Sequence, residues 1–268
     1  MHPDTSELRQ GQTFQPACGV LIDPLPRGGN ENMDIDEALL EAGCRSTKSL
    51  VRVYSWQHPT VTLGFFQKND SLSPLFRDLS VVRRLTGGGA ILHDREITYS
   101  CVVPGNHPVC RNPTDLYPAM HQKIVELLET CGARARIRGT ETGPVDFRST
   151  KDESAPPNDP FLCFLRRDRN DIVEGALDES DIRMQKDVRK LVGSAQRRRR
   201  GTILQHGSIV LETSEFAPNI AGIRNIFPSF QAQNFIQQLP WRLASVLGIA
   251  IPLSSTADAL SWLAEPET

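Results

Sequence analysis

Two short stretches of the chain combine small residues with basic side chains in an arrangement that can form a ligand site. They are residues 83–100, RRLTGGGAILHDREITYS, and residues 190–208, KLVGSAQRRRRGTILQHGS. Each is predicted to hold a turn of small residues, made of Gly87, Gly88, Gly89 and Ala90 in the first and of Gly193, Ser194 and Ala195 in the second. Because glycine lacks a Cβ, such a turn can adopt positive φ and bring backbone N–H groups close to a ligand. A hairpin whose glycines serve only backbone geometry is the alternative.

Four side chains beside these turns are candidates for binding or chemistry. Arg84 either faces the pocket and meets a ligand or is solvated, and Lys190 is either a site residue or a solvated residue at a strand edge. His93 and His206 are expected to shape the pocket by hydrogen bonding, with a purely structural role as the alternative. The sequence offers no metal-ligand constellation for these histidines to join, so we expect no metal site.

Composition narrows the class of protein. The chain has 268 residues, of which 39% are hydrophobic and 23% charged, and its formal net charge of -2 argues against a dedicated nucleic-acid binder. It has no apolar run long enough for a membrane helix and no signal-peptide pattern, so we expect a cytoplasmic protein that does not bind membranes. Six cysteines without CxxC pairs predict free thiols, one of them a candidate for reactivity: Cys18, Cys44, Cys101, Cys110, Cys131 and Cys163.

The elements that must position these residues begin with a helix and continue with strands. Asn30 or Asn32 can cap the helix, which ends at Gly43. From Leu50 the apolar pattern has a period of two, which predicts five short strands, LVRVYSW, TVTLGFF, LSVVRRL, AILH and ITYSCVV. Their brief connections predict one sheet with substantial antiparallel pairing.

Helices follow the predicted sheet. One is expected over residues 114–132, packed on the sheet, and two more over 230–247 and 256–264. The segments VRKLVGSA and TILQHGSIVLE, which precede the last two helices, are strand-like.

The remaining segments are predicted to be irregular. Residues 1–29 form a lead-in with one short strand at 18–22, and residues 139–160 form a long loop, which in a domain is usually functional or disordered. Without an internal repeat or a convincing linker, we predict a single catalytic domain over residues 1–268.

Four segments, in order, resemble the catalytic family of lipoate-protein ligases, octanoyltransferases and biotin-protein ligases. The two stretches above resemble its signature segments, and NMDIDEALL and WQHPTVTLGFFQ resemble its first helix and hairpin. The resemblance covers roughly residues 30–212. It implies an α/β (α+β) fold, with a mixed, largely antiparallel sheet flanked by helices, a narrow acyl tunnel and an essential lysine, here Lys190.

Within this family, GSAQ followed by ILQHGS, together with HDREITYS, resembles the cysteine-dependent octanoyltransferases of ligase-like sequence. Those enzymes carry a Cys-Phe pair upstream of the lysine, which Cys163 and Phe164 match, so the resemblance implies that Cys163 and Lys190 are catalytic. Two features depart from that pattern. The glycine run is closer to the ligases, and the interval from Cys163 to Lys190 is long, with an acidic segment at 174–187. Without the resemblance, Cys163 is interpreted as a small buried hydrophobe.

The implied reaction moves an octanoyl group from octanoyl-acyl carrier protein to Cys163, and then to a lysine of a lipoyl domain or a glycine-cleavage H-type protein, without a cofactor. Cysteine suits both steps because a thiolate is nucleophilic and then leaves readily. A lysine ammonium about 4 Å away would favour the thiolate by up to about 4 kcal/mol at an effective dielectric near 20. Backbone N–H groups of either small-residue turn are candidates to stabilise the oxyanion.

Other functions remain open at this point. A lipoate-protein ligase would use ATP and Mg²⁺ to form lipoyl-AMP, held by Lys190; the glycine run favours it, whereas Cys163-Phe164 and Gln196 favour the transferase. A non-catalytic acyl-binding module is a further class. The four arginines at 197–200 form either a solvated, self-repelling loop or a basic loop next to the lysine that steers acidic carrier proteins and lipoyl domains.

Overall fold

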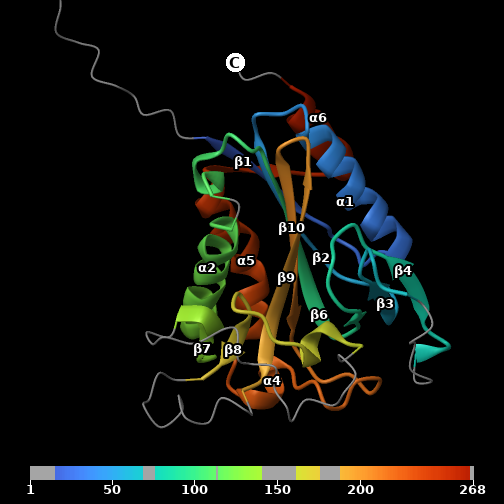
Figure 1. Cartoon of the computed structure of the whole chain (residues 1–268). Coiled ribbons are helices and arrows are strands. Elements are labelled where there is room, and N and C mark those ends of the chain that lie inside the picture. The colour runs from blue at the N-terminus through green and yellow to red at the C-terminus, as the bar shows by residue number, and fades with distance from the viewer. Residues whose placement is uncertain (1–15, 69–75, 113, 141–160, 176–187, 266–268) are drawn as a thin grey trace, which may run out of the picture.

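An eight-stranded mixed sheet forms the centre of the computed structural model, which describes residues 16–68, 76–112, 114–140, 161–175 and 188–265 (Figure 1). Its strand order is β11 (Ile249–Leu253), β1 (Ala17–Ile22), β2 (Ser49–Tyr54), β6 (Glu96–Val103), β10 (Thr202–Val210), β9 (Lys190–Arg199), β8 (Ile172–Glu174) and β7 (Ala135–Ile137). The pairs from β2 through to β7 are antiparallel, whereas β1 is parallel to both of its neighbours. The expected mixed, largely antiparallel sheet is thus confirmed.

A second, three-stranded sheet contains β4 (Ser80–Arg83), β3 (Thr60–Leu63) and β5 (Ile91–His93). All five strands predicted from residue 50 onward are present. The prediction that they share one sheet is wrong, because only β2 and β6 join the large sheet. An alternating apolar pattern records which face of a strand is buried but not which strand lies beside it.

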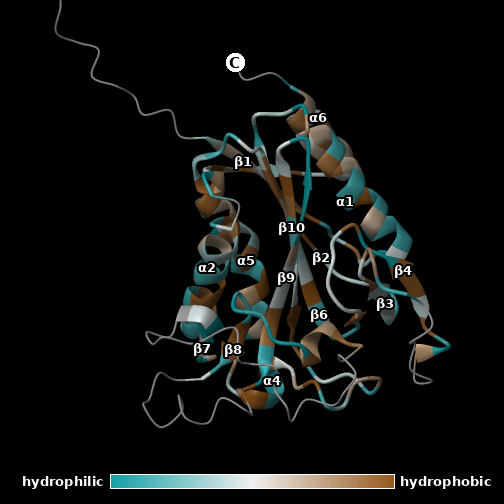
Figure 2. Cartoon of the chain, in the orientation of Figure 1, coloured by the Kyte–Doolittle hydropathy of each residue, from teal (hydrophilic) through white to brown (hydrophobic). Residues whose placement is uncertain are grey.

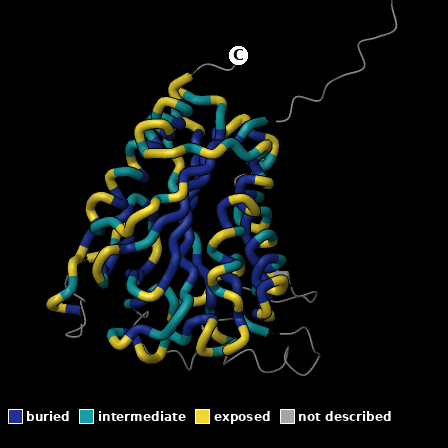
Figure 3. Tube along the Cα trace, turned by 180° about the vertical axis from the view of Figure 1, so that it is seen from behind, coloured by how far each residue is buried: buried dark blue, intermediate teal, exposed yellow. Residues whose placement is uncertain are grey.

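Two pairs of helices cover the two faces of the large sheet (Figure 1). The helices α2 (Leu116–Thr130) and α5 (Ala232–Leu247) lie on one face, and α1 (Gly29–Gly43) and α6 (Thr256–Ala264) lie on the other. The central strands are buried on both sides while the outer helix surfaces are exposed (Figure 3), and hydrophobic and hydrophilic residues alternate along the helices (Figure 2). Buried apolar residues of the strands and helices form clusters between the layers. These bounds confirm the helices predicted from periodicity.

The predicted helix cap is wrong. The residue preceding α1 is Gly28, so Asn30 and Asn32 lie inside the helix. The amide of Asn32 bonds instead to the guanidinium of Arg52 and to main-chain carbonyls. Asn32 therefore stabilises contacts between α1 and neighbouring segments of the chain instead of capping the helix.

The turn expected at the small residues of the second signature segment is absent from the described residues. Gly193, Ser194 and Ala195 lie within β9, which continues to Arg199, so the loop predicted at 197–200 is a strand up to its last residue, Arg200. The chain reverses only at Arg200 and Gly201, whose φ values of 49° and 87° suit a tight hairpin. Arg199 can extend the strand because its guanidinium pairs with Glu37 and Glu41 of α1.

Several predicted segments lie outside the described residues. They include most of the lead-in, the long loop from residue 141 to 160, and residues 176–187 of the acidic segment. The short connection between the last two helices, by contrast, forms an unpredicted strand, β11, which pairs with β1. Within the described ranges, no helix is both long and apolar enough to cross a membrane.

A buried ion pair joins α1 to the sheet. Arg52 on β2 donates to Asp36 of α1 (Nη1 to Oδ1, 2.9 Å) and to Asp23 (Nη2 to Oδ2, 2.6 Å), and all three side chains are almost wholly buried. The hydroxyls of Tyr54 and Ser100 also donate to Asp36, at 3.0 and 2.8 Å. The desolvation cost of the buried charges is therefore offset by several hydrogen bonds.

We expect Asp36→Asn to lower the free energy of unfolding by about 3 kcal/mol, because Arg52 loses a counter-charge inside the protein. Burial raises the pKa of Asp36, but the interaction with His206, 3.8 Å away, and the charge of Arg52 outweigh it, so the net pKa lies below its ordinary value. A lowered folded-state pKa gives stability that is present above the unfolded-state value, about 3.9, and is lost as the pH falls through the folded-state value.

Urea unfolding from pH 7 down to pH 3 would test this prediction. The stability of the wild type should decline more steeply below pH 4 than that of Asp36→Asn. Asp34→Asn, on the exposed face of the same helix, should change the stability by less than about 0.5 kcal/mol. Equal losses in the two variants would contradict the prediction.

Candidate active site

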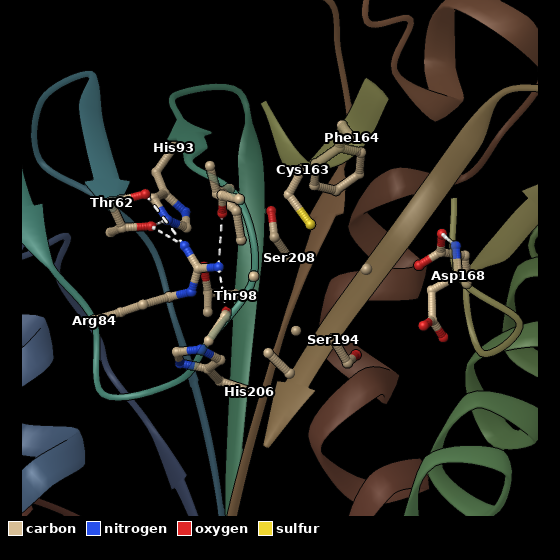
Figure 4. A pocket seen from close by; sticks show the side chains of 18 of the residues that line it. Thr62, Arg84, His93, Thr98, Cys163, Phe164, Asp168, Ser194, His206 and Ser208 are labelled. Atoms are coloured by element: carbon tan, nitrogen blue, oxygen red, sulfur yellow. Dashed lines mark hydrogen bonds between the residues drawn. The ribbon is translucent and has the colours of Figure 1, made fainter. Parts of the chain in front are cut away.

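A cavity of about 350 Å³ opens where the start of β9, the loop that contains Cys163 and the glycine turn before β5 meet (Figure 4). Every site residue expected from the sequence except Ala90 lines it: Arg84, Gly87, Gly88, Gly89, His93, Cys163, Lys190, Gly193, Ser194, Ala195 and His206. Apolar and aromatic side chains complete the wall: Met33, Tyr54, Trp56, Ile91 and Phe164. The cavity thus combines a reactive end with an apolar surface.

Cys163 and Lys190 meet at one end of the cavity. The Lys190 Nζ lies 3.8 Å from the Cys163 Sγ and 3.4 Å from its carbonyl oxygen. The ring of Phe164 lies below the ammonium, with its centroid 5.2 Å from Nζ. A thiol and an aromatic face therefore both lie close to the ammonium.

The ammonium of Lys190 also pairs with a carboxylate that the sequence analysis missed. Asp171 Oδ1 lies 2.8 Å from Nζ, and the other carboxylate oxygen, Oδ2, accepts the main-chain N–H of Asp168 at 2.7 Å. Burial raises the pKa of Asp171, opposed by the charge and hydrogen bond of Lys190. Asp171 precedes β8, which pairs with β9 at Val173 and Lys190, and only this strand pairing brings the two side chains together.

Gly193 makes room for the lysine. A Cβ at this position would lie 2.5 Å from Lys190 Cε and 2.8 Å from Nζ, so the lysine side chain folds back over the glycine. Gly193 thus lies in an extended strand, where it lets the lysine side chain approach, and not in the predicted turn.

Ala90 departs from its expected role because it does not line the cavity. It is fully buried, and its main chain holds the cysteine loop: Cys163 N donates to Ala90 O at 2.7 Å and Ala90 N donates to Phe161 O at 2.9 Å. The residue therefore joins the glycine turn to the loop that carries the thiol.

Arg84 holds the shape of the glycine turn. Its Nη2 donates to the carbonyl oxygens of Gly87 and Gly89, at 2.6 and 2.7 Å, and Nη1 donates to that of Thr62 at 3.2 Å. Burial lowers the pKa of Arg84 to about 10, and the solvated alternative is wrong because the side chain is only 2% exposed. Gly88 has a φ of 96°, which a side chain would strain.

The two histidines lie on the same side of the cavity as Arg84, away from Cys163 and Phe164 (Figure 4). His93 contacts Thr62 Oγ1 at 2.9 Å and Glu96 Oε1 at 3.0 Å, and it stacks on Trp56 with 3.9 Å between ring centroids. His206 Nε2 lies 2.6 Å from Thr86 Oγ1, and Nδ1 lies 3.8 Å from Asp36. Burial is the main cause that lowers the pKa of His206.

A second missed residue, His121, supports β9 from behind. Its Nε2 lies 2.6 Å from Ser194 Oγ, which also contacts the hydroxyl of Tyr99 at 2.8 Å. Burial lowers the pKa of His121 to about 4, so the imidazole is neutral near pH 7. Its position beside Met120, on the apolar face of the predicted helix, could have indicated that His121 is buried. No sequence pattern singles out Asp171.

The arginine run is not next to the lysine. Lys190 and Arg199 are the two ends of β9, about 30 Å apart along an extended strand. Arg199 is paired with α1, and Arg197 lies over the ring of Phe65 at 4.9 Å. The predicted basic loop beside the lysine is therefore wrong, and the basic side chains at the cavity come from Arg84, Arg166 and Arg167 instead.

We expect Gly193→Ala to leave the fold intact, with a stability change within about 1 kcal/mol, but to displace Lys190 from Cys163. Alkylation of Cys163 by iodoacetamide near pH 7 should then slow by about tenfold, because the thiolate loses part of its Coulomb stabilisation. Peptide mass analysis would distinguish Cys163 from the other thiols. The control is Gly28→Ala, where an added Cβ would meet nothing within 4 Å, and equal rates in both variants would refute the role of the glycine.

Comparisons with known proteins agree with this geometry. Residues 29–245 match the family model of the lipoyl protein ligase A/B catalytic domain. Octanoyltransferase LipM of Moorella thermoacetica is 37% identical over 185 residues, 67% of this chain and 60% of that protein. Octanoyltransferase LipM of Geobacillus kaustophilus is 36% identical over 193 residues, 69% of this chain and 62% of that protein. The matched part of the chain thus spans about 60% of the length of these relatives.

A solved structure shares the fold. Protein Ta0514 from T. acidophilum, with bound lipoic acid, superposes with a TM-score of 0.63 over 93% of both chains, at 20% sequence identity. Together with the family match over most of the chain, this likeness in fold leaves one conclusion. The chain belongs to the lipoyl protein ligase A/B catalytic domain family.

Proposed function

We propose that this chain is an octanoyltransferase of lipoate biosynthesis, folded as a single catalytic domain. In this proposal an octanoyl group moves from octanoyl-acyl carrier protein to Cys163, and then to a lysine of a lipoyl domain or of a glycine-cleavage H-type protein, without a cofactor. The observation that carries the proposal is the 3.8 Å approach of Lys190 Nζ to Cys163 Sγ inside a partly apolar cavity. The names of the LipM relatives support it.

The first step needs a thiolate, and a free thiol is mostly protonated near neutral pH. Two unit charges about 4 Å apart attract by about 4 kcal/mol at an effective dielectric near 20. Lys190 supplies such a positive charge, and the buried guanidinium of Arg84 adds a second that interacts with Cys163. The carboxylate of Asp171 offsets part of the positive charge of Lys190, so the net stabilisation of the thiolate is smaller than the full Coulomb energy.

The transfer then exchanges one thioester for another before the amide forms. The Cys163 thiolate adds to the donor carbonyl carbon, and the donor sulfur leaves with the electron pair of the broken C–S bond. An acceptor amine next adds to the same carbon and displaces Cys163. The amine loses a proton as the amide forms, and the displaced Cys163 sulfur accepts it with the help of Lys190.

The glycine turn favours one alternative, an ATP-dependent lipoate-protein ligase that acts through lipoyl-AMP. Its main-chain conformation, with Gly88 at positive φ, suits close approach of an anion. In that reaction ATP and Mg²⁺ would be needed, Lys190 would hold the acyl-adenylate, and Cys163 would be dispensable. Lipoate-dependent exchange of pyrophosphate into ATP would establish this alternative.

Cys163→Ser should abolish transfer of octanoyl from the carrier protein to an acceptor domain, with a loss of at least about 10³-fold, because an alcohol is not ionised near pH 7. Intact mass measurement of the wild type, incubated with octanoyl carrier protein and without ATP, should show a gain of one octanoyl group. Cys131→Ser, which removes a thiol outside the cavity, is the matched control. An undiminished rate in Cys163→Ser, or strict dependence on ATP, would refute the transferase.

We propose that Asp171 holds the ammonium of Lys190 in place, and we expect Asp171→Asn to lower kcat by about 10²-fold. Glu174→Gln is the control, because this nearby acid pairs with Arg189 and does not line the cavity. Steady-state kinetics should show a loss of kcat with little change of KM in Asp171→Asn alone. Equal kcat values in the two variants would refute this assignment.

A further inference from the structure

Ser208 lies at the reactive end of the cavity, although the sequence analysis did not single it out. It is on β10, directly opposite Gly193 of β9. Side chains of directly opposed residues in antiparallel strands project from the same face of the sheet. Figure 4 shows Ser208 beside Cys163. Lys190, which folds back over Gly193, lies 3.8 Å from the Cys163 thiol, so all three side chains line the same end of the cavity.

The hydroxyl of Ser208 is buried without a partner. The residue is 2% exposed, and its Oγ has no hydrogen bond to any part of the chain that the structure describes. Other hydroxyls that line the cavity are engaged: Ser194 contacts His121, and Thr62 contacts His93. A buried hydroxyl left unpaired costs about 1–3 kcal/mol, and such groups are nearly always satisfied. An acceptor atom on a ligand would remove this cost.

The N–H groups first expected to stabilise an oxyanion fit that role poorly at Gly193, Ser194 and Ala195. These three residues form a paired strand rather than a turn whose amides converge. A donor is nevertheless needed where the carbonyl oxygen gains charge, because such donors contribute strongly to acyl transfer. Ser208 is a hydroxyl donor on the same strand pair.

We infer that the Ser208 hydroxyl donates a hydrogen bond to the acyl carbonyl oxygen during transfer, and so acts as a catalytic residue. The inference rests on the proposed function. As the Cys163 Sγ bonds to the carbonyl carbon, the π electrons of the C=O bond move to its oxygen, which accepts the O–H of Ser208. When those electrons return, the C–S bond to the donor breaks and the donor thiolate departs with its electron pair. Ser208 keeps its proton throughout.

The test compares two reactions of the same thiol in the full chain. Acylation of Cys163 by octanoyl carrier protein passes through an oxyanion, whereas alkylation by iodoacetamide does not. Ser208→Ala should slow the acylation burst, followed by intact mass, by about 10- to 100-fold. It should change the alkylation rate by less than twofold, and Ser208→Thr, which retains a hydroxyl, should recover part of the acylation rate.

The matched control is Ser49→Ala. Ser49 is a second buried serine with an unpartnered hydroxyl on the same sheet, 1% exposed, but it does not line the cavity. This variant should acylate at the wild-type rate. Thermal unfolding should show both alanine variants to be at least as stable as the wild type, because each loses an unpaired buried hydroxyl.

Two results would overturn the inference. One is acylation of Ser208→Ala at the wild-type rate; the other is an equal loss of acylation and alkylation, which would mean that Ser208 acts on the thiol. Failure of the proposed function would look different, since the wild type itself would then gain no octanoyl group.

Discussion

The buried pair of Arg52 and Asp36 is the interaction on which the site depends. Burying two charges is costly, and the cost is offset only while every partner stays in place. Asp36 also faces His206, which contacts Thr86 beside Arg84, and Arg84 holds the carbonyls of the glycine turn. A continuous path of polar contacts thus runs from the first helix to the cavity wall. The charges that fix α1 on the sheet therefore also set the shape of the ligand site.

The chemistry itself is assembled from strand pairing. Lys190 starts β9, and its neighbours in β8 and β10 bring Asp171 to one side of it and Ser208 to the other. The lysine can fold back only because Gly193 leaves its space empty. Small residues in this segment therefore create room for a side chain, whereas those in the first segment create room for a main-chain turn. The two segments have similar sequence patterns but different roles. The small residues of the second segment lie within a paired strand, whereas the glycine run of the first forms a turn between two strands.

Periodicity was enough to predict most helices and strands, since burial of one face leaves a pattern along the chain. It could not separate the two sheets or find β11, whose five residues become a strand only by pairing with β1. The turn predicted at Gly193 was wrong because small residues are also compatible with an extended strand under a folded-back side chain. Asp171 and His121 were missed because distant pairing partners determine their positions. Residues that act together across strands leave no local signal.

The main-chain bonds between Ala90 and the cysteine loop have an evolutionary consequence. Because the bonds from Cys163 N to Ala90 O and from Ala90 N to Phe161 O involve no side chain, they persist through most substitutions nearby. The position of the nucleophile is thereby set by main-chain hydrogen bonds and not by the identity of neighbouring side chains. Side chains of the cysteine loop can therefore vary while the thiol keeps its register beside the glycine turn.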